Sequence, residues 1–260
     1  MSGGSALVTG AGRRLGRQMA LGLAGRGHDV AVHYAGSAAE AEATVAECRA
    51  LGVRAVALRA DLLDEAETLE LVPAAVAELG PLRVLVNNAS IFEHDTIRTA
   101  SRESWDRHMG SNLRAPFVLT QAFETQVPDP PTDENGEPVA QGLIVNMIDQ
   151  RVRKLTPEFM TYTLAKAALW TLTQTSAQAL APRVRVNAIG PGPTVRGVRQ
   201  SEDHFARQRA GTVLGRGADA AGILRALAFF LDSPAVTGEL LCVDGGQHLG
   251  WKTPDIQGVE

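Results

Sequence analysis

Seven short apolar segments, separated by longer amphipathic stretches, constrain the fold of this chain more than any other feature. They lie at residues 5–10, 29–34, 54–61, 82–89, 142–148, 184–190 and 239–245. Continuous runs of aliphatic and β-branched residues are typical of strands buried on both faces of a parallel sheet. The stretches between them show helical periodicity, at 14–26, 38–51, 64–79, 101–125, 157–181 and 219–232.

This alternation predicts the α/β class, with a Rossmann-type doubly wound parallel sheet of about seven strands. Because crossovers between parallel strands are right-handed, helices are expected on both faces. We interpret residues 1–260 as a single domain. Two segments depart from the alternation. The Pro-rich, acidic stretch 127–142 is predicted to be a surface loop, and residues near 193–215 are predicted to form a variable substrate loop.

Composition excludes several classes of protein. Charged residues make up 21% of the chain and the net charge is −4, so there is no basic surface for nucleic acid or an anionic membrane. No apolar run reaches the roughly 18 residues of a membrane span. The first predicted strand starts at residue 5, which leaves no room for a signal peptide. Cys48 and Cys242 lack metal or redox spacing. We therefore expect a cytoplasmic protein with free thiols and no metal site.

The stretch "TGAGRRLG", residues 9–16, follows the first predicted strand and predicts a phosphate cradle. Gly10 and Gly16 bracket a turn whose backbone N–H groups can approach an anion, and Leu15 lies where the next helix begins. Arg14 stands where a third glycine is often found. It can reach a phosphate or a polar ligand above the pyrophosphate, although a solvated surface arginine is the alternative.

The end of the second strand bears on the choice of cofactor. NAD enzymes usually place an acidic residue there to bind the ribose 2′-hydroxyl, but residues 33–37 include His33, Tyr34 and Ser37 and no acid. A 2′-phosphate would meet no repulsion there, and Arg13 and Ser37 can contact it. We therefore predict that NADP(H) is preferred, with NAD(H) not excluded.

Polar residues at the ends of later strands extend the predicted cofactor site. Asp61 can accept a hydrogen bond from the adenine amino group, and Asn87 and Ala89 would pass close to a ribose. Asp and Asn also cap helices and turns, so these positions support the prediction without deciding it. We assign to the cofactor the residues Asp61, Leu62, Asn88, Ala89, Ser90, Pro191 and Gly192.

Tyr162 and Lys166, four residues apart, lie on one face of the predicted helix 157–181. A free tyrosine has a pKa of about 10, and a nearby ammonium stabilises the phenolate, which would make the hydroxyl a usable acid near neutral pH. An isolated pair of this kind also occurs on ordinary exposed helices, so the spacing alone does not establish catalysis.

Several landmarks in sequence order resemble the short-chain dehydrogenase/reductase family over essentially the whole chain. They are Thr9-Gly10…Gly16, Asp61, "NNA" (87–89), Asn112 in "SNLRAPF", Tyr162-x-x-x-Lys166, "VNAIGPG" (186–192) and "VDGG" (243–246). The resemblance implies that Lys166 also binds the nicotinamide ribose, and that Asn112 anchors a water in a proton relay. It further implies a homotetramer that pairs the helices containing Asn112 and Tyr162.

Within that family the chain is similar to pteridine reductases and dihydromonapterin reductases. The similarity lies in "TGAGRRLG" with Arg14, "HYAGSAAEA", "NNASIF" with Phe92 and "NMID" with Asp149. One departure is Gly36, because those reductases have a basic residue there, next to the 2′-phosphate. This departure weakens the NADP(H) assignment without reversing it.

Asp149 occupies a position, thirteen residues before Tyr162, where most of the family has a serine. An ionised carboxylate would repel the negative charge that builds on oxygen during ketone reduction. It suits a substrate that presents N–H donors or takes a proton on nitrogen, such as the C=N bond of a dihydropterin. The resemblance therefore implies a catalytic set of Asn112, Asp149, Tyr162 and Lys166.

A flat pterin also needs a stacking surface, and Phe92 is the candidate, with burial in the core as its alternative. Arg14 and Ser90 can meet the polar edge of the substrate, beside Asp149 and Tyr162. The C-terminal segment with His248, Trp251 and Lys252 either crosses to a neighbouring subunit's active site or places Trp251 on its own substrate loop.

Three hypotheses for function follow. The first is an NADPH-dependent pteridine or dihydropteridine reductase. The second is a carbonyl reductase acting on a ketone, an acyl thioester or a sugar, against which Asp149 counts. The third is a non-catalytic NADP(H)-binding sensor, although sensors tend to lose the tyrosine or the lysine and both are present here.

Overall fold

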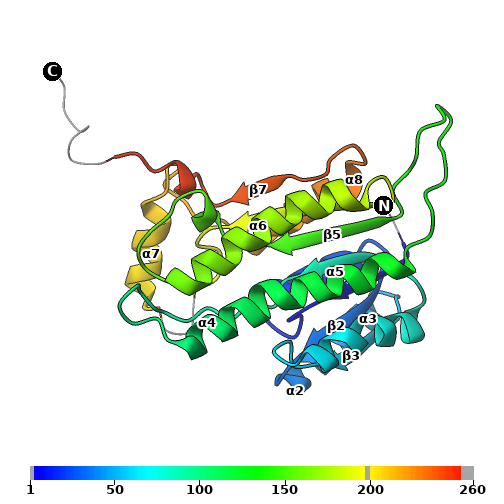
Figure 1. The fold of residues 1–260 in the computed structure, drawn as a ribbon, viewed down its shortest axis with the longest axis horizontal. Coiled ribbons are helices and arrows are strands. Elements are labelled where there is room, and N and C mark those ends of the chain that lie inside the picture. Colours follow the sequence, from blue (N-terminus) through cyan, green and yellow to red (C-terminus); the bar gives the residue numbers. More distant parts are fainter. Residues whose placement is uncertain (1–2, 197–199, 253–260) are drawn as a thin grey trace.

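The computed structural model describes residues 3–196 and 200–252, which form one parallel sheet with helices on both faces (Figure 1). The strand order is β3-β2-β1-β4-β5-β6-β7. The strands are β1 Ser5–Val8, β2 Asp29–Tyr34, β3 Ala55–Arg59, β4 Leu82–Asn87, β5 Gly142–Met147, β6 Val184–Pro191 and β7 Leu240–Val243. The order reverses between β1 and β4, which is where α/β sheets of this kind bind ligands.

The helices cover the two faces as the predicted topology requires. They are α1 Arg14–Ala24, α2 Ala38–Ala50, α3 Glu65–Leu79, α4 Arg102–Met109, α5 Ala115–Gln126, α6 Met160–Leu180, α7 Glu202–Ala210 and α8 Ala220–Asp232. Three single turns are η1 Gly110–Arg114, η2 Gln150–Val152 and η3 Gln247–Leu249. The predicted fold class is confirmed, and each predicted strand overlaps an observed one.

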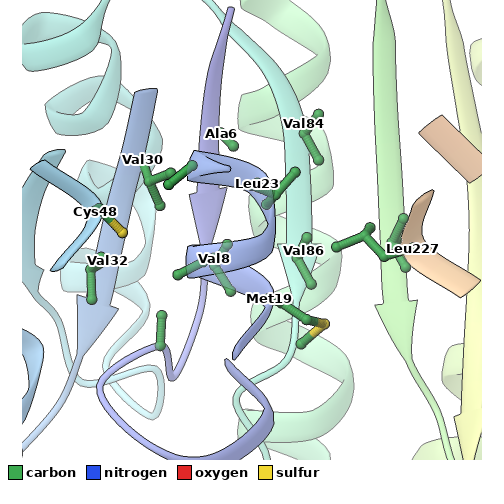
Figure 2. Close-up of a cluster of buried hydrophobic side chains, with 14 of the residues drawn as sticks. Ala6, Val8, Met19, Leu23, Val30, Val32, Cys48, Val84, Val86 and Leu227 are labelled. Carbon is green, nitrogen blue, oxygen red and sulfur yellow. The ribbon is translucent and has the colours of Figure 1, made fainter. Parts of the chain in front are cut away.

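Alternation along the strands builds a separate core on each face of the sheet. Ala6 and Val8 of β1 point toward α1, α2 and α8, whereas Leu7 between them points toward α3, α5 and α6. Figure 2 shows the first of these cores, in which Met19 and Leu23 of α1 pack on the valines of β2 and β4. Because the central strands are buried on both faces, their side chains are predominantly apolar, as their sequences predict.

Two helical features were not predicted from the sequence. The predicted helix 101–125 is interrupted by a π-helical turn at Gly110–Arg114, which contains Asn112. The second feature is α7, which lies inside the predicted substrate loop. None of its residues is buried, so it lacks the apolar periodicity that reveals a helix. Arg209 of α7 donates hydrogen bonds to the carbonyls of Pro193 and Ala218, which attaches the helix to both ends of that loop.

The acidic stretch 127–142 forms a loop, as predicted, with one short antiparallel bridge between Thr132 and Pro138. It leaves α5 at the amino end of β5, the edge of the sheet opposite the site described below (Figure 1). Among residues 3–196 and 200–252, no helix is long and apolar enough to cross a membrane.

Candidate active site

The glycine-rich turn after β1 is held so tightly that side chains cannot enter it. Gly10 has φ of 62°, in the left-handed region, and a Cβ there would lie 3.0 Å from the Cα of Ala89. A Cβ on Gly16 would lie 2.2 Å from the carbonyl oxygen of Gly10. Thr9 reinforces the contact, since its hydroxyl accepts hydrogen bonds from the N–H groups of Asn88 and Ala89.

This turn fits the pyrophosphate of a dinucleotide. It leads directly into α1, whose N-terminal N–H groups lack helical partners and carry the positive end of the helix dipole. The first turn of α1 contains no acidic residue that would repel an anion. Leu15 contributes its backbone there while its side chain packs against the core. The residues that the sequence assigned to the phosphate cradle therefore come together in one turn.

His33 supports the turn from below rather than facing the ligand. Its ring is buried, its Nδ1 accepts a hydrogen bond from the N–H of Gly10 at 3.0 Å, and its Nε2 lies 3.0 Å from the carbonyl oxygen of Ala60. These partners require a neutral ring with the proton on Nε2. Burial lowers the pKa of His33, which keeps the ring neutral. The neighbouring Tyr34 packs against the same core.

The proposed 2′-phosphate region is open and contains both charges. The Arg13 guanidinium forms an ion pair with Glu40 at 2.5 Å, and both side chains are exposed. Ser37 lies beside them, 2.9 Å from where a Cβ on Gly12 would be. A Cβ on Gly36 would have no described atom within 4 Å. A phosphate arriving here would compete with Glu40 for Arg13.

Arg14 connects the glycine-rich turn to the substrate loop. It is one of the non-glycine residues with positive φ, at 52°, and its guanidinium donates a hydrogen bond to the carbonyl oxygen of Val195 at 3.0 Å. A residue with a strained backbone at the N-terminus of α1 thus contacts the substrate loop. Contacts of Arg14 with a pyrophosphate or a substrate remain a prediction. Residues 197–199 of the loop lie outside the described part of the chain.

The remaining predicted cofactor residues divide into exposed groups and structural ones. Asp61 is exposed and accepts a hydrogen bond from the N–H of Leu63, whereas the Leu62 side chain is buried in the core. Asn87 is buried and donates to Asn146, so its side chain does not reach the cleft. Asn88 instead donates to the carbonyls of Thr9 and Gly10.

The end of β6 lies against the segment that follows β7. Pro191 is the last residue of β6, and the N–H of Gly192 donates to the carbonyl oxygen of Val243. A Cβ on Gly192 would lie 2.6 Å from the Cα of Asp244. The backbone of residues 191–192 is therefore fixed at the carboxyl edge of the sheet, where a bound dinucleotide would pass.

Asn112 lies in the π-helical turn between α4 and α5. Its side-chain carbonyl accepts from the N–H of Ile91 at 2.8 Å, and its amide donates to the carbonyl oxygen of Ile91 at 2.8 Å. π-Helical turns inside α-helices frequently occur at functional sites. This one directs Asn112 at the loop after β4 and so fixes that loop, which contains Ser90 and Phe92.

Asp149 and Tyr162 are in direct contact, as their spacing suggested. The Tyr162 hydroxyl donates to Oδ2 of Asp149 at 3.1 Å, and the N–H of Arg151 donates to Oδ1 at 2.8 Å. Burial raises the pKa of the Asp149 carboxyl, although the Arg151 N–H and the charges of Arg151 and Lys166 act in the opposite direction. The raised pKa shifts the Asp149 carboxyl toward its protonated form.

The structure corrects the expected direction of the Tyr162 pKa. Burial and the adjacent Asp149 charge raise it well above the ordinary value, and a hydrogen bond from Ser90 only partly offsets this. Tyr162 is therefore protonated in the resting site and is a hydrogen-bond donor. The sequence argument considered Lys166 alone and omitted the nearer carboxylate.

Lys166 is buried and its ammonium donates to the carbonyl oxygen of Met147 at 2.7 Å. Its Nζ lies 5.8 Å from the centre of the Tyr162 ring. Burial lowers the pKa of Lys166 to about 8, with Asp149 acting in the opposite direction. Lys166 is thus a positive charge beside the acid pair that loses its proton in mildly alkaline solution.

Phe92 is neither core nor an isolated stacking surface. It is 45% exposed, its ring is stacked on that of Phe159 at 4.3 Å, and it meets the Tyr162 ring edge-on at 4.7 Å. Phe159 has φ of 57° and lies under the Arg151 guanidinium, 5.1 Å from its ring centre. Phe92 and Phe159 form an aromatic wall beside the acid pair.

Sequence reasoning missed Phe159, Arg151 and His108 at this site. Phe159 precedes the helix that contains Tyr162, and nothing in the sequence signals its left-handed backbone. His108 packs edge-on against the Tyr162 ring at 6.0 Å. Its position four residues before Asn112, on the same helix, was the available signal.

The C-terminal segment returns toward the site. Gln247–Leu249 contacts Gln150–Val152, and Nδ1 of His248 lies 2.7 Å from the buried carboxyl of Asp244. Trp251 is 56% exposed, with the Lys252 ammonium 6.0 Å from its ring centre, and its packing on the substrate loop remains a prediction. Residues 253–260 lie outside the described residues, and a crossing to a neighbouring subunit remains a prediction.

Comparison with protein families identifies the scaffold. The family described as "short chain dehydrogenase" matches residues 5–206. The chain belongs to this family. It is accordingly an oxidoreductase of the short-chain dehydrogenase/reductase type, with the family's Asn, Tyr and Lys at positions 112, 162 and 166. The hypothesis of a non-catalytic sensor therefore loses its support.

Similar proteins include two kinds of reductase. The 3-oxoacyl-[acyl-carrier-protein] reductase FabG of Staphylococcus epidermidis is 33% identical over 250 residues, which cover 94% of this chain and 99% of the relative. The crystal structure of FolM Alternative dihydrofolate reductase 1 from Brucella suis, in complex with NADP, is 42% identical with a TM-score of 0.89, covering 97% of this chain and 98% of that one. A blue fluorescent protein from a metagenomic library, in complex with NADPH, is 32% identical with a TM-score of 0.85, covering 95% and 98%.

Proposed function

We propose that this protein is an NADPH-dependent reductase of a pteridine or dihydropteridine C=N bond. The observation that carries the proposal is the contact between Asp149 and the Tyr162 hydroxyl at 3.1 Å, where a serine would hold a carbonyl oxygen in most of the family. A carboxyl with a raised pKa can deliver a proton to a ring nitrogen and accept a hydrogen bond from an exocyclic amino group. A ketone has neither of these nitrogen groups and takes its proton on oxygen.

The residues of the site divide the work of such a reaction. NADPH, when bound, supplies the hydride to carbon. Tyr162 and Asp149 hold the proton that the substrate nitrogen takes up, and Lys166 supplies the positive charge that limits the cost of leaving negative charge on that pair. Asn112 fixes the loop that contains Ser90 and Phe92.

NADP(H) is the cofactor of this reaction. The similar structures from Brucella suis and the metagenomic library hold NADP and NADPH. In this chain residues 33–37, at the end of the second strand, include no acidic residue, and Arg13 is exposed. An arriving phosphate can take Arg13 from Glu40.

The aromatic wall supports a flat substrate. Phe92 is stacked on Phe159 and is 45% exposed, and offset stacking favours a planar heterocycle over a flexible acyl chain. The FolM Alternative dihydrofolate reductase 1, by its name, acts on a pteridine-containing compound, and at 42% it is more similar in sequence than the FabG relative.

Reduction of a 3-oxoacyl thioester is the second candidate. The observation that favours it is the 33% identity to the 3-oxoacyl-[acyl-carrier-protein] reductase over nearly the full length of both chains. That reaction builds negative charge on a ketone oxygen, which Asp149 would oppose in its ionised form but not in its protonated form. The two candidate functions therefore make different demands on one residue, Asp149.

The test is NADPH oxidation with dihydrobiopterin, dihydromonapterin and dihydrofolate, set beside acetoacetyl thioesters and simple ketones. We expect turnover of at least one pterin, and a loss of about 100-fold in kcat in Asp149→Ser. Asp149→Asn is the matched variant, since it keeps the shape and loses the titratable proton. Ketone or thioester turnover with inert pterins would overturn the proposal.

We also propose a homotetramer. The exposed apolar side chains Leu63, Leu69, Trp105, Phe117 and Leu164 lie on α4, α5, α6 and the segment from residue 63 into α3, which cover one face of the sheet in Figure 1. Their burial between subunits would remove them from water. Light scattering that gave a monomer at micromolar concentration would contradict this.

A further inference from the structure

A chain of buried hydrogen bonds lies behind Tyr162 and uses none of the residues assigned to catalysis. Asp95, Thr161 and His108 are each at most 2% exposed. They come from the loop after β4, the first turn of α6 and the last turn of α4. Thr161 directly precedes Tyr162, and the His108 ring contacts the Tyr162 ring edge-on.

The donors and acceptors of this chain allow one arrangement. Asp95 accepts from the N–H of Thr161 at 3.1 Å, from the Ser104 hydroxyl at 3.0 Å and from the Thr161 hydroxyl. Because a carboxylate only accepts, the single hydroxyl proton of Thr161 goes to Asp95. The Thr161 oxygen is then free to accept from Nδ1 of His108 at 2.7 Å, while Nε2 of His108 accepts from the N–H of Glu93 at 3.2 Å. His108 is therefore neutral, with its proton on Nδ1.

The charges around His108 agree with that assignment. Burial lowers its pKa, with the carboxylates of Asp95 and Glu93 and the carbonyl oxygen of Ser104 acting in the opposite direction and Arg107 adding to the lowering. Arg107 also holds the Glu93 carboxylate at 2.9 Å. Burial raises the pKa of Asp95, but the hydrogen bonds from Thr161 and Ser104 outweigh it, and the net pKa is lowered. A protonated His108 would point a second N–H at the N–H of Glu93.

We propose that Asp95, Thr161 and His108 are positioning residues for Tyr162, and that the site is assembled when His108 is neutral. The first turn of α6 follows Phe159, whose left-handed backbone is strained. The carbonyl of Asp95 accepts from the N–H of Met160 and its carboxylate from Thr161, so Asp95 holds that turn at two successive residues.

The same chain fixes the opposite wall of the site. The N–H of Glu93, bonded to His108, immediately follows Phe92. The network thereby sets both the approach of the Tyr162 hydroxyl to Asp149 and the position of Phe92. This role concerns the proton donor of the family's reaction, so it does not depend on which substrate is reduced.

The first test is Thr161→Val, which removes the hydroxyl with little change in shape. We expect kcat, measured with whichever compound of the panel above is turned over, to fall at least about 10-fold, with KM for NADPH within about 2-fold of wild type. Thr161→Ser, which restores the hydroxyl, should recover kcat to within about 3-fold. The control is Thr173→Val on the same helix, where a buried hydroxyl donates to Leu169 and accepts from Asn146. It should lower the melting temperature and leave kcat unchanged.

The second test is the pH profile of His108→Gln, in which the amide oxygen can still accept from Glu93 but the donor to Thr161 is lost. Wild-type kcat should decline only at a pH below the ordinary histidine value of about 6.5, because His108, whose pKa is lowered by burial, gains a proton there. In the variant kcat should be low and lack that decline. A wild-type kcat in Thr161→Val, or an unchanged acid limb in His108→Gln, would overturn the proposal. If Thr161→Val does not fold, the His108→Gln profile decides.

Discussion

The two halves of the sheet build the candidate site by different means. On the side of β1–β3, the proposed cofactor surface is mostly backbone, and steric contacts such as that of Gly16 with Gly10 fix its shape. On the side of β4–β7, the surface is made of side chains, and Asp149, Tyr162 and Lys166 are placed by hydrogen bonds and burial. Rigid backbone contacts therefore shape the first half, whereas hydrogen bonds and charges among buried side chains shape the second.

A buried histidine in each half makes the comparison concrete. His33 holds its proton on Nε2 and supports the turn at Gly10, whereas His108 holds its proton on Nδ1 and supports Thr161. Burial lowers both pKa values. The same side chain thus braces backbone in both halves, in opposite tautomers. Damage to the first half should appear in cofactor binding, and damage to the second in the rate of chemistry.

The largest effect should come from Tyr162→Phe, which removes the proton donor. We expect kcat to fall about 1,000-fold, in line with general acid catalysis. The dissociation constant of NADPH, measured by fluorescence titration, should stay within about 2-fold of the wild-type value because the glycine-rich turn is unchanged. A variant that kept a tenth of the wild-type kcat would end the assignment of Tyr162 as the acid.

Gly16→Val should disrupt the glycine-rich turn in the first half of the molecule. Its Cβ would overlap the carbonyl oxygen of Gly10, at 2.2 Å, so the turn must shift. We expect KM for NADPH to rise about 100-fold as the phosphate contacts are lost. Gly36→Ala is the control, since its Cβ meets no described atom within 4 Å, and its KM should not change. Equal increases in KM in the two variants would contradict the claim that the steric contact at Gly16 shapes the cofactor site.

The alkaline limb of the pH profile belongs to the second half. Burial lowers the pKa of Lys166 to about 8, so the ammonium loses its proton as the pH rises through that value. We expect kcat to fall about 10-fold per pH unit above about 8. Initial rates from pH 6 to 10 at saturating NADPH would measure it, and a flat profile up to pH 10 would contradict the role of the charge.

Acid should weaken the first half through His33. Its pKa is lowered in the folded state, so the unfolded chain takes up a proton first as the pH falls below about 6.5. Stability is therefore full above that pH and is lost below it, by up to about 1.4 kcal/mol per pH unit. Urea unfolding at pH 7, 6 and 5 should show a smaller slope in His33→Gln, and an identical slope would argue against a neutral His33.

The smallest effect should be a gain. Gly36→Arg adds a cation at the open position where the reductases that this chain resembles have a basic residue, and we expect KM for NADPH to fall about 3-fold. Gly36→Gln has similar length without charge and should leave KM near wild type. A gain in both variants would mean that contact area rather than charge is responsible.

The sequence predicted the first half of the molecule better than the second. Strand periodicity located all seven strands, and the spacing of glycines located the turn, because both are local properties. The contact of Asp149 with Tyr162 was also predictable, since the two residues flank one connection. The left-handed Phe159, the tautomer of His108 and the π-helical turn at Asn112 were not. Each depends on partners from distant segments, which a single sequence does not bring together.

If Arg13 binds the 2′-phosphate as proposed, its exposed ion pair with Glu40 makes the choice of cofactor depend on the ionic strength of the solution. The Arg13 side chain is 60% exposed, and in water at 0.15 M salt the field of an exposed charge decays over about 8 Å. Added salt would therefore weaken the attraction of Arg13 for a 2′-phosphate while leaving the buried acid pair unaffected. The ratio of the KM values for NADH and NADPH should then decrease as the salt concentration rises, without any change in kcat.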